Sequence, residues 1–242
     1  MNIAVVIPAY NEAATIRDVA LRALHQLPTV YVVDDGSSDG TSAQVSDIGV
    51  HCIRNAGNCG KGGAIVAGAE AALAAGASGV ITLDGDGQHA PEDIPGLLAA
   101  ADRVPSAIVI GARVRNRDRA PPARRMANAI ADFWVSWAAG LRIQDTQSGF
   151  RYYPASVFDL PVGHGRSAGF VFESEVLIEA VRHGHGCICV PIDTVYPKQA
   201  RASHFRPFKD ISRIVVMVAG KLLKWGLYPL GLARTLFGKR GA

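Results

Sequence analysis

Residues 80–89 of the chain read Val-Ile-Thr-Leu-Asp-Gly-Asp-Gly-Gln-His, an apolar run that leads into two carboxylates. The apolar residues predict a buried strand. Gly85 and Gly87 predict that the strand stops there, because glycine adopts backbone angles that other residues avoid. Asp84 and Asp86 would then converge on one point in solvent. Converging carboxylates repel each other unless a cation lies between them, and hard oxygen ligands of this kind suit Mg²⁺ or Mn²⁺.

The alternative for these two acids is an ordinary surface turn, since Asp and Gly are common turn residues. Their position at the end of an apolar strand favours a metal site instead, because open α/β sheets bind ligands at the carboxyl ends of their strands.

Apolar runs and helical patterns alternate along most of the chain. This alternation predicts an α/β fold with a doubly wound, mainly parallel sheet and flanking helices. Strands are expected at residues 3–7, 30–33, 50–53, 80–83, 107–111 and 187–195. Helices are expected after Asn11, from about residue 63 to 75, from Pro91, and at 126–140, 172–183 and 210–225.

Composition bears on the size of the core and on the cellular compartment of the protein. With 242 residues and 49% hydrophobic content, the chain can bury a substantial core. No signal peptide is recognisable at the amino terminus, so a cytoplasmic location is expected. The four cysteines fit that compartment as free thiols, and their spacing does not match a zinc site.

Charge is distributed unevenly. Residues 201–242 carry nine Lys and Arg against one acid, a net charge of +8, whereas residues 1–200 carry 16 basic and 20 acidic residues, a net charge of −4. A basic tail indicates an anionic partner. The tail is too apolar for a nucleic-acid partner, and Lys221 and Lys224 interrupt any spanning helix.

We therefore divide the chain into an α/β domain, residues 1–210, and a basic amphipathic membrane-associating tail, residues 211–242. An amphipathic segment lying in the membrane interface fits this tail best. The alternative is a C-terminal helix docked on the core or on a second subunit, which would make a homo-oligomer.

The other predicted strand ends also carry polar residues. Tyr10 could stack on a base, and Glu12 could accept hydrogen bonds from a ring nitrogen or a ribose, while Asn11 would cap the following helix. Asp34 and Asp35 could bind a ribose or a base edge. The alternative for this acidic pair is a cap on the helix after residue 41.

A glycine-rich turn at residues 57–63 does not have the spacing of a Walker loop. Lys61, at the start of the next helix, could nevertheless meet a diphosphate. Residues 113–125 hold six arginines and one acid, which suits either a phosphate or a solvated surface. Trp134 and Trp137 in the following helix suit either a membrane interface or a core.

Four motifs together resemble the family 2 inverting glycosyltransferases of GT-A fold. They are Val-Ile-Pro-Ala-Tyr-Asn-Glu at 6–12, Val-Asp-Asp-Gly-Ser-Ser-Asp-Gly-Thr at 33–41, Leu-Asp-Gly-Asp-Gly-Gln-His at 83–89 and Asp-Thr-Gln-Ser-Gly-Phe-Arg at 145–151. The match is closest to the branch that includes dolichol-phosphate mannose synthases and polyprenyl-phosphate glucose synthases. The resemblance implies that residues 1–210 form a GT-A domain.

The resemblance also implies a nucleotide-diphosphate sugar donor and a divalent metal. Asp84 and Asp86 would hold the metal, with Gln88 assisting, and the metal would stabilise the departing nucleotide. The candidate donor-binding residues are Pro8, Ala9, Tyr10, Glu12, Asp34, Asp35, Lys61 and Asp84.

In this branch the acceptor is a lipid phosphate, which is already an anion near neutral pH, so a strong base is not required. The Arg113–Arg125 stretch would screen the two anions, together with basic residues further along. An acceptor hydroxyl would instead require Asp145 or Glu175 as a base. The candidate catalytic residues are therefore Asp86, Arg113, Asp145 and Glu175, and the additional basic residues are Lys198, Arg201, Arg206 and Lys209.

Two other classes of protein are considered. One is a non-catalytic nucleotide- or lipid-binding membrane adaptor. The other is a sugar nucleotidyltransferase, which would need a glycine-rich loop with an arginine directly after the first strand, and Pro8-Ala9-Tyr10 does not supply it. The expected protein is a metal-dependent glycosyltransferase, peripheral at the inner face of the membrane.

Overall fold

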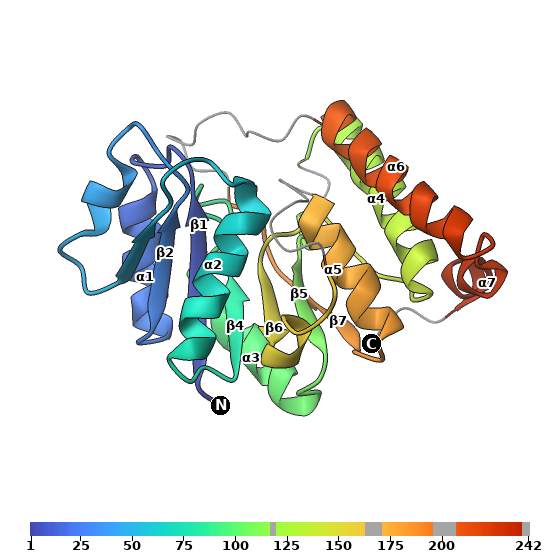
Figure 1. Cartoon of the computed structure of the whole chain (residues 1–242), viewed down its shortest axis with the longest axis horizontal. Helices are drawn as coiled ribbons and strands as arrows, with labels where there is room; N and C mark the ends of the chain where they lie inside the picture. The colour runs from blue at the N-terminus through green and yellow to red at the C-terminus, as the bar shows by residue number, and fades with distance from the viewer. Residues whose placement is uncertain (117–119, 163–170, 196–206, 239–242) are drawn as a thin grey trace.

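The computed structural model describes residues 1–116, 120–162, 171–195 and 207–238, with side chains from residue 211 onward in the last range. It contains one seven-stranded sheet with the order β3-β2-β1-β4-β6-β5-β7 (Figure 1). Strand β6 runs antiparallel to β4 and β5, and all other neighbours are parallel. The predicted doubly wound, mainly parallel sheet is confirmed.

The strands are β1 (Ile3–Ala9), β2 (Val30–Asp34), β3 (His51–Arg54), β4 (Gly79–Thr82), β5 (Ile108–Ala112), β6 (Arg151–Pro154) and β7 (Cys187–Pro191). The α-helices are α1 (Ile16–Gln26), α2 (Gly60–Ala74), α3 (Ile94–Arg103), α4 (Pro122–Ala139), α5 (Val171–Arg182), α6 (Pro207–Lys224) and α7 (Pro229–Phe237). Short 3₁₀ turns are η1 (Thr41–Val45), η2 (Pro91–Asp93) and η4 (Ala155–Val157).

Both faces of the sheet are buried, which explains why its strands read as continuous apolar runs. Along β1, Val5 and Ile7 point into the cluster that includes α1 and α3. Val6, on the opposite face, points into the cluster that includes α2, α4 and α5. In Figure 1, α2 and α5 lie on the viewer's side of the sheet.

The start of α1 differs from the prediction. The helix begins at Ile16, and Asn11 does not cap it. Asn11 instead has a left-handed backbone, with φ of 57°, and its side-chain oxygen accepts a hydrogen bond from the Ser38 N–H. Asparagine tolerates this conformation and competes well in turns. Asn11 therefore connects the loops after β1 and β2 instead of capping α1.

The basic tail also differs from a single amphipathic segment, because it forms two helices, α6 and α7 (Figure 1). The inner face of α6 is part of the hydrophobic core shared with α4 and α5. Its buried residues are Ile211, Ile214, Val218 and Leu222. The inner face of α6 thus matches the alternative in which the C-terminal helix docks on the core.

Side chains at the end of α6 reinforce this docking. Lys221 forms ion pairs with Glu175, at 3.0 Å, and with Glu179 on α5. The guanidinium of Arg182 stacks over the Trp225 ring at 3.8 Å. Within the described ranges, no helix combines the length and apolar character needed to cross a membrane.

Trp134 and Trp137 on α4 are half-buried and stack on each other, with ring centroids 5.4 Å apart. The Trp137 Nε1–H donates to the Leu227 carbonyl at 3.1 Å, which ties α4 to the turn between α6 and α7. The two tryptophans therefore pack the C-terminal helices against α4.

Candidate functional site

The carboxyl ends of β1, β2 and β4 meet at one edge of the sheet, where the polar motifs of the sequence come together. Ala9 lies opposite Asp34 in the register of β1 and β2. Pro8 and Ala9 are buried within the strand. Tyr10 is the first residue of this motif to reach the surface, with 38% of its area exposed.

Hydrogen bonds hold the loops after β1 and β2 to each other. The Asn11 N–H donates to Ser37 Oγ at 2.9 Å, the Glu12 N–H to Thr41 Oγ1 at 2.9 Å. Asp39, not the Asp34–Asp35 pair, accepts from the backbone N–H of Thr41, at 3.0 Å. The predicted alternative of an Asp34–Asp35 cap at this position is therefore wrong. The two loops form one preorganised surface beside Tyr10.

Asp35 instead caps α2. Its carboxylate accepts from the backbone N–H groups of Cys59, at 2.9 Å, and Gly60, at 2.8 Å. This cap orients the first turn of α2, where Lys61 lies. Asp34 is fully buried, and its Oδ2 lies 3.8 Å from Arg54 Nε, an ion pair without a hydrogen bond in the described structure. A buried carboxylate oxygen without a hydrogen-bond donor can accept one from a ligand, and Asp34 Oδ2 lies at a strand end.

Asp84 forms the centre of the site. Its Oδ1 lies 2.7 Å from the Lys61 ammonium, which lies 3.0 Å from Oε2 of Glu173 on α5. The His89 Nε2 lies 3.7 Å from Asp84 Oδ2. Burial alone would raise the pKa of Asp84, but the Lys61 charge and the His89 ring outweigh it and lower that pKa well below its usual value.

Asp86 and Gln88 follow in the turn. The Gln88 N–H donates to Asp86 Oδ1 at 2.9 Å. Burial, and then the neighbouring Asp84 charge, raise the pKa of Asp86. A carboxylate that is harder to ionise beside a second acid is stabilised when a cation binds between them. The oxygen donors of these two acids and their charge imbalance fit a divalent cation.

A complete metal cage is not built from side chains. In residues 1–116, 120–162, 171–195 and 207–238, no group of three or more His, Cys, Asp and Glu side chains could hold a metal ion. A metal at Asp84, Asp86 and Gln88 would thus rely on water and ligand oxygens for its other positions, as Mg²⁺ commonly does.

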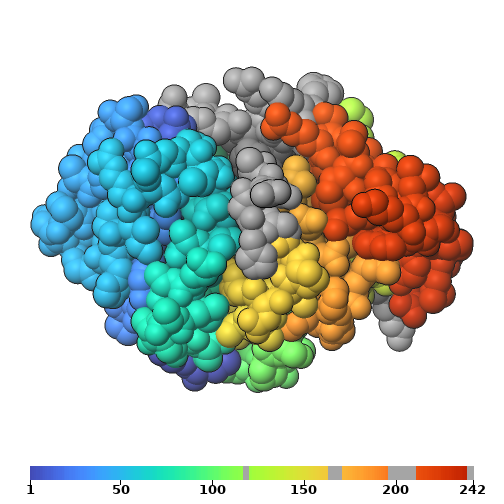
Figure 2. Space-filling model, in the orientation of Figure 1, coloured from blue at the N-terminus to red at the C-terminus, as the bar shows by residue number. Residues whose placement is uncertain are grey.

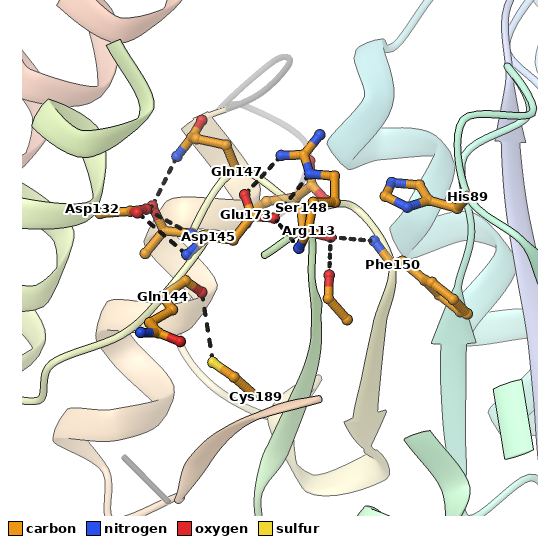
Figure 3. A network of polar contacts seen from close by, with 12 residues as sticks. His89, Arg113, Asp132, Gln144, Asp145, Gln147, Ser148, Phe150, Glu173 and Cys189 are labelled. Carbon is orange, nitrogen blue, oxygen red and sulfur yellow. Dashed lines mark hydrogen bonds and ion pairs between the residues drawn. The ribbon is translucent and has the colours of Figure 1, made fainter. Parts of the chain in front are cut away.

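A second polar cluster lies at the end of β5 (Figure 3). Arg113 and Asp145 form a bidentate pair, with Nε–Oδ2 of 2.9 Å and Nη2–Oδ1 of 2.8 Å. Burial opposes the ionisation of Asp145, but Arg113 overcomes it and lowers the Asp145 pKa. Asp132 on α4 accepts from Thr146 N, at 2.8 Å, and Thr146 Oγ1, at 2.7 Å. Burial and the Asp145 charge raise the pKa of Asp132 to about 6.

This cluster borders a cavity with a basic rim. Arg113, Arg124 and Arg125 line it together with Asn128, and the acids Asp132 and Asp145 also contribute to the lining. Arg124 and Arg125 lie in the first turn of α4, which begins at Pro122 rather than near residue 126. Arg113 is paired with Asp145, so Arg124 and Arg125 are the lining arginines outside that pair, and arginine is the side chain that binds phosphate bidentately. Arg117, Arg119, Lys198, Arg201 and Arg206, and the Lys209 side chain, lie outside the described residues.

Glu175, the other candidate base, points toward α6, where it pairs with Lys221. It therefore does not join the cluster around Asp84 in this structure. The α5 acid that does join this cluster is Glu173, two residues earlier, which pairs with Lys61.

Arg151 is a fully buried residue whose role the sequence did not reveal. Its guanidinium donates to the backbone carbonyls of Ser148, Thr146 and Glu173, at 2.7, 2.7 and 2.8 Å. It thereby fixes the 145–149 loop and the first turn of α5. Glu173, Asp132 and Arg151 were all missed as site residues. The available signal was an acid or arginine within an otherwise apolar segment, which alone does not identify its partner.

Comparison with known proteins identifies the chain. The sequence model described as "Glycosyl transferase family 2" matches residues 4–179. The chain belongs to this glycosyltransferase family. The matched range includes Lys61, Asp84, Asp86, Arg113 and Glu173, so both polar clusters lie inside the family domain.

Several characterised relatives resemble this transferase over most of their length. Polyprenol monophosphomannose synthase of Mycolicibacterium smegmatis is 32% identical over 202 residues, covering 78% of this chain and 75% of the relative. Undecaprenyl-phosphate mannosyltransferase of Micrococcus luteus is 30% identical, with 94% and 95% covered. UDP-N-acetylglucosamine–dolichyl-phosphate N-acetylglucosaminyltransferase of Methanococcus voltae is 29% identical, with 90% and 96% covered.

Solved structures show that this transferase has the GT-A fold. Mannosyl-3-phosphoglycerate synthase from Rubrobacter xylanophilus superposes with a TM-score of 0.68 at 19% identity, covering 93% of this chain and 75% of that one. Glucosyl-3-phosphoglycerate synthase from Mycobacterium tuberculosis, solved with Mn²⁺, UDP and phosphoglyceric acid, gives 0.63 at 22% identity, covering 92% and 78%. The predicted GT-A class and the predicted enzyme class are confirmed, and the non-catalytic adaptor is set aside.

The Asp132 environment predicts a pH-dependent stability. Because the pKa of Asp132 is raised to about 6 in the folded protein, the folded state holds this proton more tightly than the unfolded state does. The stabilisation that protonated Asp132 gives the folded state is present below about pH 4 and is lost as the pH rises through about 6. In the Asp132→Asn variant the side chain cannot ionise, so the variant does not lose this stabilisation as the pH rises. The free energy of unfolding of the variant, relative to wild type, should therefore rise by up to about 3 kcal/mol from pH 4 to pH 7.

Urea unfolding at a series of pH values measures this difference. Exposed Asp102→Asn on α3 is the matched control. A difference between Asp132→Asn and wild type that is constant over this pH range would contradict the described environment.

Proposed function

We propose that this transferase moves a sugar from a nucleotide-diphosphate sugar to a polyprenyl phosphate, with inversion and with Mg²⁺ or Mn²⁺, at a membrane surface. The observation that carries the proposal is that two charged regions lie at the same edge of the sheet, one suited to a cation and the other to an anion. One is the acid turn of Asp84 and Asp86, and the other is the arginine-lined cavity beside Arg113. The relatives named for polyprenol, undecaprenyl and dolichyl phosphates support the acceptor class.

The donor would occupy the acid turn. Tyr10 and Asp34 Oδ2 would meet the nucleoside, and Lys61 would meet the diphosphate. Asp84, Asp86 and Gln88 would hold the metal, which supplies charge neutralisation for the departing nucleotide. The glucosyl-3-phosphoglycerate synthase solved with UDP and Mn²⁺ supports a divalent metal in this fold.

The acceptor phosphate would lie in the arginine-lined cavity. Arg113 is oriented by its bidentate pair with Asp145, and Arg124 and Arg125 project from the start of α4. A phosphate oxygen then attacks the anomeric carbon on the face opposite the diphosphate. The new carbon–oxygen bond forms as the bond from that carbon to the diphosphate breaks. The nucleoside diphosphate leaves, and the configuration at the anomeric carbon inverts.

The side chains favour a phosphate acceptor over a hydroxyl. A phosphate monoester loses its second proton near pH 6, so no base has to deprotonate it. A hydroxyl acceptor requires a base, and both candidates are held by cations: Asp145 by Arg113 and Glu175 by Lys221. Either base would first have to give up its ion pair.

The donor proposal predicts metal-linked nucleotide binding. In a calorimetric screen of UDP-sugars and GDP-sugars, at least one should bind, and Mn²⁺ should strengthen its binding. Asp86→Asn keeps the side-chain size but removes a charge, so it should lower turnover with a polyprenyl phosphate by about 10²-fold or more. Asp159→Asn, at an exposed position in the turn after η4 and away from the acid turn, is the control.

Chelation with EDTA should abolish turnover, and Mn²⁺ should restore it. Undiminished turnover in EDTA, or in Asp86→Asn, would contradict the metal role. Binding by none of the nucleotide sugars would remove the donor proposal altogether.

We further propose that the outer side of α6 and α7 lies on the membrane. Val216, Leu223 and Phe237 there are 72%, 70% and 87% exposed, and Lys224 and Arg234 are exposed beside them. Figure 2 shows α6 and α7, in red, forming the outer surface at the end of the molecule opposite the N-terminal half. Exposed apolar side chains interspersed with cations suit an anionic lipid surface.

This surface predicts a specific binding loss. The double variant Leu223→Ser and Phe237→Ser should bind vesicles rich in phosphatidylglycerol more than about tenfold less tightly, since burying one such side chain contributes about 2 kcal/mol. Leu21→Ser, on α1, is the control because Leu21 is also exposed, at 36%. Co-sedimentation with vesicles measures the change.

Nucleotide affinity should stay unchanged in the double variant. Undiminished vesicle binding by the double variant would contradict the proposed membrane surface. If the double variant also changed from dimer to monomer, this surface would instead be an interface with a second copy of the chain. A deletion from residue 211 is unsuitable for this test, because it also removes core residues such as Ile214.

A further inference from the structure

Lys61 is not a solvated lysine at the rim of a cleft. Its ammonium lies between Asp84 Oδ1, at 2.7 Å, and Glu173 Oε2, at 3.0 Å, and only 17% of its side chain is exposed. The two carboxylates come from segments far apart in the sequence. A buried ammonium requires such partners, since an unpaired one would be strongly destabilised.

The backbone of Gly149 closes this ion pair from one side. A Cβ atom at Gly149 would lie within 2.7 Å of both Asp84 carboxylate oxygens and closer still to the Lys61 nitrogen. The Thr82 hydroxyl donates to the Gly149 carbonyl at 2.8 Å and holds this backbone in place. The position of the ammonium is therefore set by packing as well as by charge.

The ammonium occupies Oδ1 of Asp84, one of the two oxygens through which Asp84 could bind the proposed metal. Asp84, Asp86 and Glu173 carry three negative charges, and Lys61 compensates one of them on the Asp84 side. A divalent ion that binds Oδ1 would therefore displace Lys61, and one that binds Oδ2 would be repelled by the nearby ammonium, so Lys61 opposes the ion in either position.

Glu173 can retain the lysine during this exchange. Its Oε1 is buried and has no hydrogen-bond partner in the described structure. Arg151 fixes the Glu173 backbone by donating to its carbonyl at 2.8 Å. The spare carboxylate oxygen provides a second acceptor for the ammonium once Asp84 is released.

We propose that Lys61 is an internal placeholder cation: it neutralises Asp84 in the nucleotide-free enzyme, and Glu173 retains it when a divalent ion takes its place. The inference rests on the proposed donor and metal site. An arriving diphosphate gives the displaced ammonium a further anionic partner. Divalent-ion binding is consequently weak without nucleotide and strong with it, which makes Lys61 the residue that couples the two.

Mn²⁺ titration of the nucleotide-free protein, followed by electron paramagnetic resonance, tests this role. Lys61→Met removes the competing charge and should bind Mn²⁺ about tenfold tighter than wild type. Lys61→Gln should do the same, which keeps the test available if the Met variant does not fold. Lys61→Arg keeps the charge and should restore weak binding. Arg103→Gln, an exposed cation on α3, is the control and should match wild type.

A second titration adds UDP or GDP, whichever binds the wild type. The nucleotide should strengthen Mn²⁺ binding markedly in wild type and Lys61→Arg, and much less in Lys61→Met and Lys61→Gln. Unchanged or weaker Mn²⁺ affinity in folded, nucleotide-free Lys61→Met and Lys61→Gln would overturn the proposal. The titration with Mn²⁺ alone involves no sugar transfer, so its failure is distinguishable from failure of the proposed function.

Discussion

One buried cation organises this enzyme. The Lys61 ammonium is held between Asp84 and Glu173, and neither carboxylate is near it in the sequence. Because a buried charge is tolerated only with well-placed partners, the start of α2, the turn after β4 and the start of α5 must all reach the same point. Gly149 adds a fourth segment, since any side chain there would enter the ion pair. The site thus belongs to the fold as a whole.

Arg151 extends the same constraint to the acceptor side. A buried guanidinium has five N–H donors that need acceptors, and here they include carbonyls of the 145–149 loop and of Glu173. That loop also carries Asp145, which orients Arg113, and Thr146, which is bound by Asp132. The region assigned to the donor and the region assigned to the acceptor phosphate therefore rest on one loop.

The sequence was informative wherever the signal was local. Apolar runs followed by polar residues predicted β1, β2 and β4 and the edge at which Asp34 and Asp84 lie, because strand ends in a parallel sheet meet at one edge. Asn11 misled, because the same side chain suits a helix cap and a left-handed turn. Glu173 and Asp132 were not predictable, since their importance depends on partners that only the tertiary fold supplies. The tail was ambiguous for a related reason: an apolar helix face looks alike whether lipid or α4 covers it. In α6 the inner face meets α4, and the outer face remains apolar.

The central claim is that the acids of the β4 turn and the donor diphosphate share one divalent ion. Electron–nuclear double resonance on the Mn²⁺ complex, with ¹³C-labelled aspartate carboxylates in the protein and a bound nucleoside diphosphate, tests it most directly. We expect ¹³C and ³¹P hyperfine couplings to the same Mn²⁺, with the ¹³C coupling diminished in Asp86→Asn. A ³¹P coupling without any ¹³C coupling would show that the nucleotide alone holds the metal, and it would contradict the account.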